Sequence, residues 1–150
     1  MQKVVVTGGA GFIGSHLVDK LIEQGIKVIV LDDYSTGKNR NQKACHINVD
    51  ITTIDPNKFL NKETDIDAIF HLAAKTTVQE SINKPKYYNN VNVKGTLNML
   101  MLANKLNIKR FIFSSSSSVY GDAKTPTSEN YPLNPLSPYA LNKLIGEQYC

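Results

Sequence analysis

The sequence predicts an α/β protein in which helices cover both faces of a parallel sheet. Short apolar runs alternate along the 150-residue chain with longer segments whose apolar residues recur at helical spacing. The short runs are apolar throughout rather than at every second position, which is typical of strands buried on both faces. This order of elements predicts a doubly wound sheet with the strand order 3-2-1-4-5.

The first half of the chain supplies three of the predicted strands. The first strand covers residues 2–7 (QKVVVT) and leads through a glycine turn into a helix over residues 12–24, where Ile13, Leu17 and Leu21 recur at helical spacing. Residues 27–31 (KVIVL) and residues 45–49 are rich in β-branched residues and are the second and third strands.

The second half supplies two more strands and two helices. We predict strands over residues 68–72 (AIFHL) and 110–114 (RFIFS), with a long helical segment over residues 85–106 between them. The serine run 114–118 follows a buried strand directly, so we interpret it as a strand end opening into a loop rather than as a flexible linker. Ser137 and Pro138 are typical of a helix start and begin a last helix over residues 137–150.

Composition limits the class of protein. Hydrophobic residues make up 41% and charged residues 20% of the chain, which is the balance of a single globular domain. No run approaches the roughly 20 apolar residues of a membrane span, and the chain starts on a strand-like run instead of a signal peptide. Cys45 and Cys150 fit neither a metal cluster nor a disulfide framework. We therefore expect a cytoplasmic protein with neither a bound metal nor a membrane partner.

The net charge of +4 raises the question of nucleic-acid binding. The lysines are scattered from Lys3 to Lys143 without a basic stripe or interleaved aromatic residues, so a solvated lysine-rich surface is the better interpretation. A positive balance still suits a doubly anionic ligand such as a dinucleotide or a nucleotide sugar.

The turn after the first predicted strand is rich in glycine. It reads TGGAGFIG and matches G-x-G-x-x-G at Gly9, Gly11 and Gly14, and also G-x-x-G-x-x-G from Gly8. Glycine is needed where a tight turn brings the backbone close to a pyrophosphate and the N–H groups of the following helix face that anion. Such a turn can be purely structural, but its place between a strand and a helix favours dinucleotide binding.

Acidic residues follow the second and third predicted strands. Asp32 lies 18 residues after Gly14, where a carboxylate can accept hydrogen bonds from an adenosine ribose. A 2′-phosphate at that place would meet this negative charge, so the sequence favours NAD over NADP, although Lys38 and Arg40 leave some room for NADP. Asp50 and Ile51 are placed to flank the adenine.

Six motifs occur in the order found in the extended short-chain dehydrogenase/reductase family. They are TGGAGFIG, LDDYSTG (31–37), HLAA (71–74), NVKGT (92–96), SSSVYG (116–121) and Tyr139-x-x-x-Lys143. The sequence resembles the NAD-dependent epimerases and dehydratases of this family, and in particular the N-terminal half of nucleotide-sugar 4-epimerases that act on UDP-glucose or UDP-N-acetylglucosamine. The resemblance implies a Rossmann-like NAD-binding domain over residues 1–150, truncated before a C-terminal substrate domain.

The resemblance also implies roles for individual residues. Those expected to contact the pyrophosphate, the adenosine ribose, the adenine and the inner part of the cofactor are Gly8, Gly11, Phe12, Ile13, Gly14, Asp32, Asp33, Tyr34, Ser35, Thr36, Gly37, Asp50, Ile51, Leu72, Ala73, Ala74, Asn92 and Ser114. One departure concerns the fourth loop, where several epimerases have a lysine at the place of Thr76 and this chain has Lys75 one residue earlier.

Tyr139 and Lys143 are the predicted catalytic pair and also cofactor contacts. Residues four apart share one face of a helix, so the ammonium group can lie near the phenol. A free tyrosine has a pKa of about 10, and a neighbouring positive charge favours the phenolate that a general base requires. A tyrosine four residues before a lysine is routine on helix surfaces, but the upstream motifs predict an active tyrosine here. The resemblance assigns Ser116 to the sugar hydroxyl, against the simpler reading of one polar residue in a solvated run.

The reaction implied by the resemblance is epimerisation at C4 of a UDP-sugar or a related nucleotide sugar. NAD would abstract the C4 hydride while Tyr139 takes the hydroxyl proton, the 4-keto sugar would turn, and the hydride would return to its other face. Related dehydratases place an Asp-Glu pair where this chain has Ser117 and Ser118, which favours epimerisation over elimination. A dehydratase or reductase of the same family remains the alternative, as does an inactive truncated module for NAD binding or dimerisation.

The resemblance implies assembly as well. The helices over residues 92–106 and 137–150 resemble those that form a four-helix dimer interface in this family, so a homodimer is expected. The last helix reaches Cys150 without a stop signal, and we expect the chain to be a fragment that has little activity alone.

Overall fold

The computed structural model describes residues 1–55 and 65–150, and its sheet has the predicted topology. Every neighbouring pair of strands is parallel, and Val5 of the central strand lies in register with Ile29 on one side and Ile69 on the other. The strand order is β3-β2-β1-β4-β5. The strands are β1 (Lys3–Thr7), β2 (Lys27–Asp32), β3 (Cys45–Asn48), β4 (Ala68–His71) and β5 (Phe111–Phe113).

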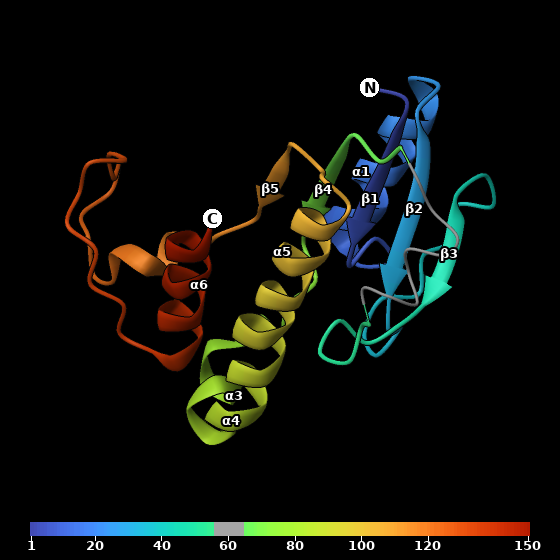
Figure 1. Cartoon of the computed structure of the whole chain (residues 1–150). Helices are drawn as coiled ribbons and strands as arrows, with labels where there is room; N and C mark the ends of the chain where they lie inside the picture. The colour runs from blue at the N-terminus through green and yellow to red at the C-terminus, as the bar shows by residue number, and fades with distance from the viewer. Residues whose placement is uncertain (56–64) are drawn as a thin grey trace.

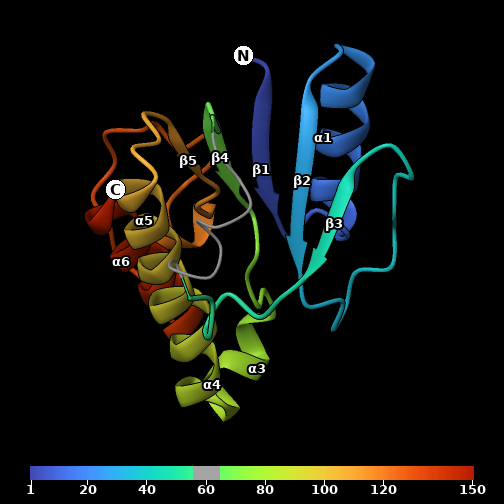
Figure 2. The same ribbon diagram turned by 45° about the vertical axis from the view of Figure 1, so that its right-hand side comes forward.

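Helices cover both faces of this sheet (Figures 1 and 2). Helix α1 (Phe12–Glu23) packs on one face and α5 (Gly95–Lys105) on the other, so the sheet is doubly wound as predicted. Helix α6 (Pro138–Tyr149) packs against α3 (Val78–Asn83), α4 (Pro85–Asn89) and the turn that leads into α5. In residues 1–55 and 65–150, none of the helices combines the length and the apolar character that crossing a membrane requires.

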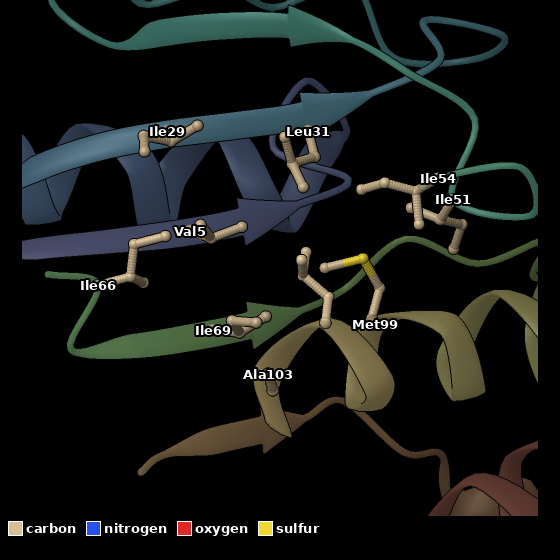
Figure 3. Close-up of a cluster of buried hydrophobic side chains, with 10 residues drawn as sticks. Val5, Ile29, Leu31, Ile51, Ile54, Ile66, Ile69, Met99 and Ala103 are labelled. Atoms are coloured by element: carbon tan, nitrogen blue, oxygen red, sulfur yellow. The ribbon is translucent and has the colours of Figure 1, made fainter. Parts of the chain in front are cut away.

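The core consists of two apolar layers because successive residues of a strand point to opposite faces of the sheet. The layer between the sheet and α5 contains Val5, Ile29, Leu31, Ile51, Ile54, Ile66, Ile69, Met99, Leu102 and Ala103 (Figure 3). The layer between the sheet and α1 contains Val4, Val6, Val18, Leu21, Val28, Val30 and Ala68. Burial of one such side chain stabilises the fold by about 1.5–3 kcal/mol. Both faces of the central strands are buried, which explains their uninterrupted apolar sequence.

Some elements differ from the sequence prediction. The helix predicted over residues 85–106 consists of α4, a π-helical turn η1 (Asn90–Lys94) and α5. The short helix α3 and the 3₁₀ turn η2 (Ser117–Tyr120) were not predicted. Both are too short to show helical periodicity in the sequence. Strand β5 is also shorter than the predicted run 110–114.

A buried hydrogen-bond network joins the ends of β1 and β4. The Thr7 hydroxyl oxygen accepts the backbone N–H groups of Leu72 and Ala73 at 3.2 and 3.1 Å, so its own proton is left for His71 Nδ1 at 2.8 Å. With Nδ1 accepting, His71 Nε2 carries the ring proton and donates it to Thr96 Oγ1 at 3.0 Å. The network therefore specifies one neutral tautomer of His71.

Burial and the nearby charge of Lys143 both keep this ring neutral. His71 is 1% exposed, and burial followed by the Lys143 charge lowers its pKa from 6.5 to about 3. The two other histidines have structural or surface positions. His46 accepts the Tyr34 hydroxyl group, and the exposed His16 lies edge-on to Phe12.

The depressed pKa of His71 predicts a loss of stability in acid. Between pH 6.5 and 3 the unfolded chain binds a proton at this ring and the folded chain does not, so stability is complete above pH 6.5 and falls as the pH falls. We expect this histidine to contribute a slope of about 1.4 kcal/mol per pH unit in urea unfolding between pH 6 and 5. His71→Gln should lose that slope, and equal slopes in the two proteins would contradict the assignment.

Candidate functional site

The carboxyl ends of the strands open into a cavity of about 390 Å³. Its lining comes from the loops that follow all five strands and from the first half of α6. Of the residues that the sequence predicts to bind a cofactor, all line the cavity except Tyr34 and Asn92. The sequence analysis missed six lining residues: Leu31, Val49, Lys75, Thr76, Val91 and Ser115. Most of these follow or end a predicted strand, which is the signal that could have identified them.

The glycine turn is held against the loop that follows β4. Gly8 has a φ of +68°, and a Cβ atom there would lie 2.7 Å from the backbone nitrogen of Ala73. A Cβ on Gly14 would overlap the Gly8 carbonyl oxygen. Gly11 precedes α1 without a side-chain hydrogen bond to the first turn, so the N–H groups of Phe12 and Ile13 are available to an anion beside the cavity.

Asp32 ties the turn to the end of β2. The residue is 8% exposed, and its carboxylate accepts the backbone N–H of Ala10 at 2.9 Å and that of Tyr34 at 2.8 Å. A carboxylate has about four lone-pair sites, so two remain for a ligand in the cavity. Asp32 is therefore both a structural connection and an acceptor that lines the cavity.

A lysine joins two loops at the edge of the cavity. Lys75 Nζ donates to Ser35 Oγ at 2.7 Å, and the Ser35 hydroxyl and backbone N–H groups donate to Asp33 at 2.6 and 2.9 Å. Partial burial raises the pKa of Asp33, but the Ser35 hydrogen bonds and the Lys75 charge outweigh it, so the pKa lies below its ordinary value. The loops after β2 and β4 are thus connected through a charged group, although the lysine expected at position 76 is absent.

Two predicted cofactor residues have other partners. The side chain of the buried Asn92 exchanges two hydrogen bonds with the Lys75 backbone, at 2.8 and 2.9 Å, and so holds the loop that lines the cavity. Tyr34 has a φ of +55°, and its hydroxyl group lies 2.8 Å from His46 Nδ1. The Arg40 guanidinium lies 3.9 Å from the Tyr34 ring centroid. Neither Tyr34 nor Asn92 is part of the cavity lining, and Asn92 supports Lys75, which is.

Tyr139 and Lys143 reach the cavity from the first two turns of α6. They are 8% and 5% exposed, and Lys143 Nζ donates to the Ser114 carbonyl oxygen at 2.7 Å. Burial lowers the pKa of Lys143 to about 8, so most of its ammonium groups remain charged at pH 7. Two of its three N–H donors are left for other partners. The sequence-predicted pair and the glycine turn therefore meet in one cavity.

The serines of the run 114–118 differ in whether they line the cavity. Ser114 and Ser115 line the cavity, and the Ser115 hydroxyl donates to the Glu147 carboxylate of α6. Ser116 lies outside the lining and caps η2, because its Oγ accepts the N–H and hydroxyl groups of Ser118 at 3.2 and 2.9 Å. The described residues contain no group of three or more His, Cys, Asp or Glu side chains that could hold a metal.

Comparison with known proteins places this geometry in a family. Residues 4–150 match the model of the NAD dependent epimerase/dehydratase family. The chain belongs to this family. Among its relatives, the UDP-glucose 4-epimerase of Lactobacillus helveticus is 44% identical to this chain over 152 aligned residues, which cover 98% of this chain and 46% of the relative.

Solved structures of family members share the fold. The Thermotoga maritima UDP-glucose 4-epimerase, solved with UDP-glucose, is 39% identical, has a TM-score of 0.91, and is matched over 99% of this chain and 50% of its own. The Thermus thermophilus UDP-glucose 4-epimerase, solved with NAD, is 33% identical with a TM-score of 0.89, over 99% and 49% of the two chains. The chain spans about half the length of the relatives it matches.

Two glycines of this epimerase/dehydratase family member provide a matched test of the close approach at Gly8. Gly25 also has a positive φ, +77°, but a Cβ atom there would meet nothing within 4 Å. Gly25→Ala should cost about 1 kcal/mol of unfolding free energy through backbone strain alone. Gly8→Ala should cost about 1–3 kcal/mol more in urea unfolding, because the new methyl group displaces the Ala73 backbone. Equal losses would show that the approach of the two loops is not tight.

Proposed function

We propose that this chain is the NAD-binding part of a nucleotide-sugar 4-epimerase of the UDP-glucose/UDP-galactose type. The observation that carries the proposal is that Tyr139 and Lys143 line the same cavity as the glycine turn. The names of the relatives, each a UDP-glucose 4-epimerase, support the reaction and the substrate class. Residues 1–150 would form the NAD-binding domain, and further residues of a longer protein would bind the nucleotide sugar.

The cavity fits an adenine dinucleotide. The backbone packing leaves no room for a Cβ atom at Gly8 or Gly14, and the first-turn N–H groups of α1 would supply donors to a pyrophosphate. Asp32 would accept the adenosine ribose hydroxyls, Asp50 and Ile51 would flank the adenine, and Lys143 would reach the nicotinamide ribose. Arg40, a candidate partner for a 2′-phosphate, instead lies over the Tyr34 ring outside the cavity lining. This supports NAD rather than NADP.

The selectivity for NAD can be measured apart from turnover. Calorimetry should show that the protein binds NAD more tightly than NADP, because a 2′-phosphate would meet the Asp32 carboxylate. Asp32→Ala should weaken both nucleotides, since it also releases the Ala10 and Tyr34 backbone groups, and should lower the ratio of NAD to NADP affinity by about tenfold or more. Tighter binding of NADP, with an unchanged ratio in the variant, would reject this role of Asp32.

The side chains of α6 can move the proton of the reaction. NAD, when bound, supplies reversible hydride acceptance at C4 of the sugar. Tyr139 would take the proton of the C4 hydroxyl and return it, as a general base and then a general acid. The Lys143 ammonium, with a pKa of about 8, carries a positive charge at neutral pH in the cavity that Tyr139 also lines. Ser116, although outside the cavity lining, would assist at the sugar hydroxyl, since its Oγ accepts two hydrogen bonds and keeps its own proton to donate.

The serine run favours epimerisation over elimination. The positions at which related dehydratases carry an acid and a base hold Ser117 and Ser118. One carboxylate, that of Glu147, does reach this segment, but it accepts the Ser115 hydroxyl and lies outside the cavity lining. Because that acid and base are missing, a sugar dehydratase, which the family also contains, is only the second candidate.

Substitution of Tyr139 tests the proposed reaction. In the protein at its natural length, Tyr139→Phe should reduce epimerisation of UDP-galactose or UDP-N-acetylgalactosamine by a factor of about 10² to 10⁴ and leave NAD affinity nearly unchanged. Ser116→Ala should lose less, because it deletes one hydrogen bond rather than the proton acceptor. Wild-type turnover by Tyr139→Phe would rule out the general base. A wild-type protein that releases a dehydrated sugar instead of the 4-epimer would favour the second candidate.

A cytoplasmic homodimer is the assembly that we propose. Apolar side chains of α5 and α6 are exposed, among them Leu97 and Met101 on α5 and Leu141 and Tyr149 on α6. Burial of such side chains between two copies would stabilise a dimer. Cys45 and Cys150 are both free thiols, which is compatible with a reducing compartment.

A further inference from the structure

Every backbone N–H group in the first turn of α6 donates a hydrogen bond, and one of the acceptors lies outside the helix. Pro138 has no N–H group, the Ala140 N–H donates to Ser137 Oγ at 3.1 Å, and the Leu141 N–H donates to the Ser137 carbonyl oxygen at 2.9 Å. The remaining N–H, that of Tyr139, donates to Ser81 Oγ of α3 at 3.1 Å. The backbone of Tyr139 is therefore fixed by a residue that lies far away in the sequence.

Ser81 is confined to this role by its own contacts. It is 0% exposed, and its hydroxyl proton is donated to the Val78 carbonyl oxygen at 2.5 Å. The Ser81 backbone N–H donates to the Thr77 carbonyl oxygen at 3.0 Å, which places the side chain on the first turn of α3. With its proton committed, Oγ faces Tyr139 only as an acceptor.

The anchor connects Tyr139 to the loop that follows β4. Thr76 lines the cavity, and two residues later the chain enters α3. The base of α3 is itself held, because the buried Tyr88 hydroxyl accepts the Thr77 N–H at 3.2 Å and donates to Glu80 at 3.0 Å. Lys143, in contrast, is anchored to the end of β5 through the Ser114 carbonyl oxygen. The two members of the pair thus have separate anchors.

We propose that Ser81 is a positioning residue for Tyr139. Its hydroxyl oxygen fixes the Tyr139 backbone relative to α3, and the Ser114 carbonyl fixes Lys143 relative to the sheet, so the two anchors together set the placement of these two side chains relative to each other. The inference rests on the proposed function, because it gives Ser81 its effect through a catalytic Tyr139. A displacement of about 1 Å at a reacting group can reduce turnover as much as 100-fold.

The test compares Ser81→Ala with Ser137→Ala in the protein at its natural length. Both variants delete one serine acceptor for one N–H group in the same helical turn, but only Ser81→Ala releases Tyr139. We expect Ser81→Ala to lower kcat about 10- to 100-fold while KM and NAD affinity stay within about twofold. Ser137→Ala should destabilise the protein comparably and lower kcat several-fold less. In amide hydrogen exchange, Ser81→Ala should remove protection at Tyr139 selectively.

Each outcome decides the proposal. Equal losses of kcat in the two variants would show that Ser81 is a structural residue and overturn the inference. A rise in KM that matches the loss of stability would have the same meaning. Unchanged protection of the Tyr139 amide in Ser81→Ala would overturn the anchor itself. A wild-type protein without epimerase activity would instead overturn the proposed function, and the exchange measurement would still decide whether Ser81 holds Tyr139.

Discussion

The contact between the glycine turn and the loop after β4 is the constraint on which the rest of the structure depends. Parallel pairing of β1 with β4 brings their carboxyl ends together, and the Thr7 hydroxyl closes the gap by accepting two N–H groups of that loop. His71 and Thr96 extend the same network to α5, which covers the sheet. The main chains of the two loops can therefore come close at Gly8, and both loops line the cavity.

Helix α6 brings the side chains of Tyr139 and Lys143 to the cavity. Lys143 binds the end of β5, and one turn later Gly146 packs on the Phe113 ring with no room for a Cβ atom. Glu147 then accepts the hydroxyl group of Ser115. Three successive contacts thus set the register of the helix against the strand. The burial that these contacts produce also lowers the pKa of Lys143, so packing and electrostatics have the same cause.

The fold and most of the site follow from local sequence features. Uninterrupted apolar runs predict strands buried on both faces, and the residues after them line the cavity because parallel strands end at one edge of the sheet. Features that depend on side-chain direction could not be predicted. Tyr34 lies within a correct motif, but its left-handed backbone directs the hydroxyl to His46. The identical serines of the run gave no sign that Ser115, and not Ser116, lines the cavity. Ser81 was missed because α3 is too short to show periodicity.

The two backbone hydrogen bonds of Asp32 have a thermodynamic consequence. The Asp32 carboxylate, which is already held by the N–H groups of Ala10 and Tyr34, needs no ordering when a ligand arrives, so the entropy of placing it is lost during folding rather than during binding. Folding and ligand affinity then depend on the same bonds. A change that loosens this turn weakens both at once, and a bound dinucleotide returns stability to the sheet in proportion to the logarithm of its concentration above the dissociation constant.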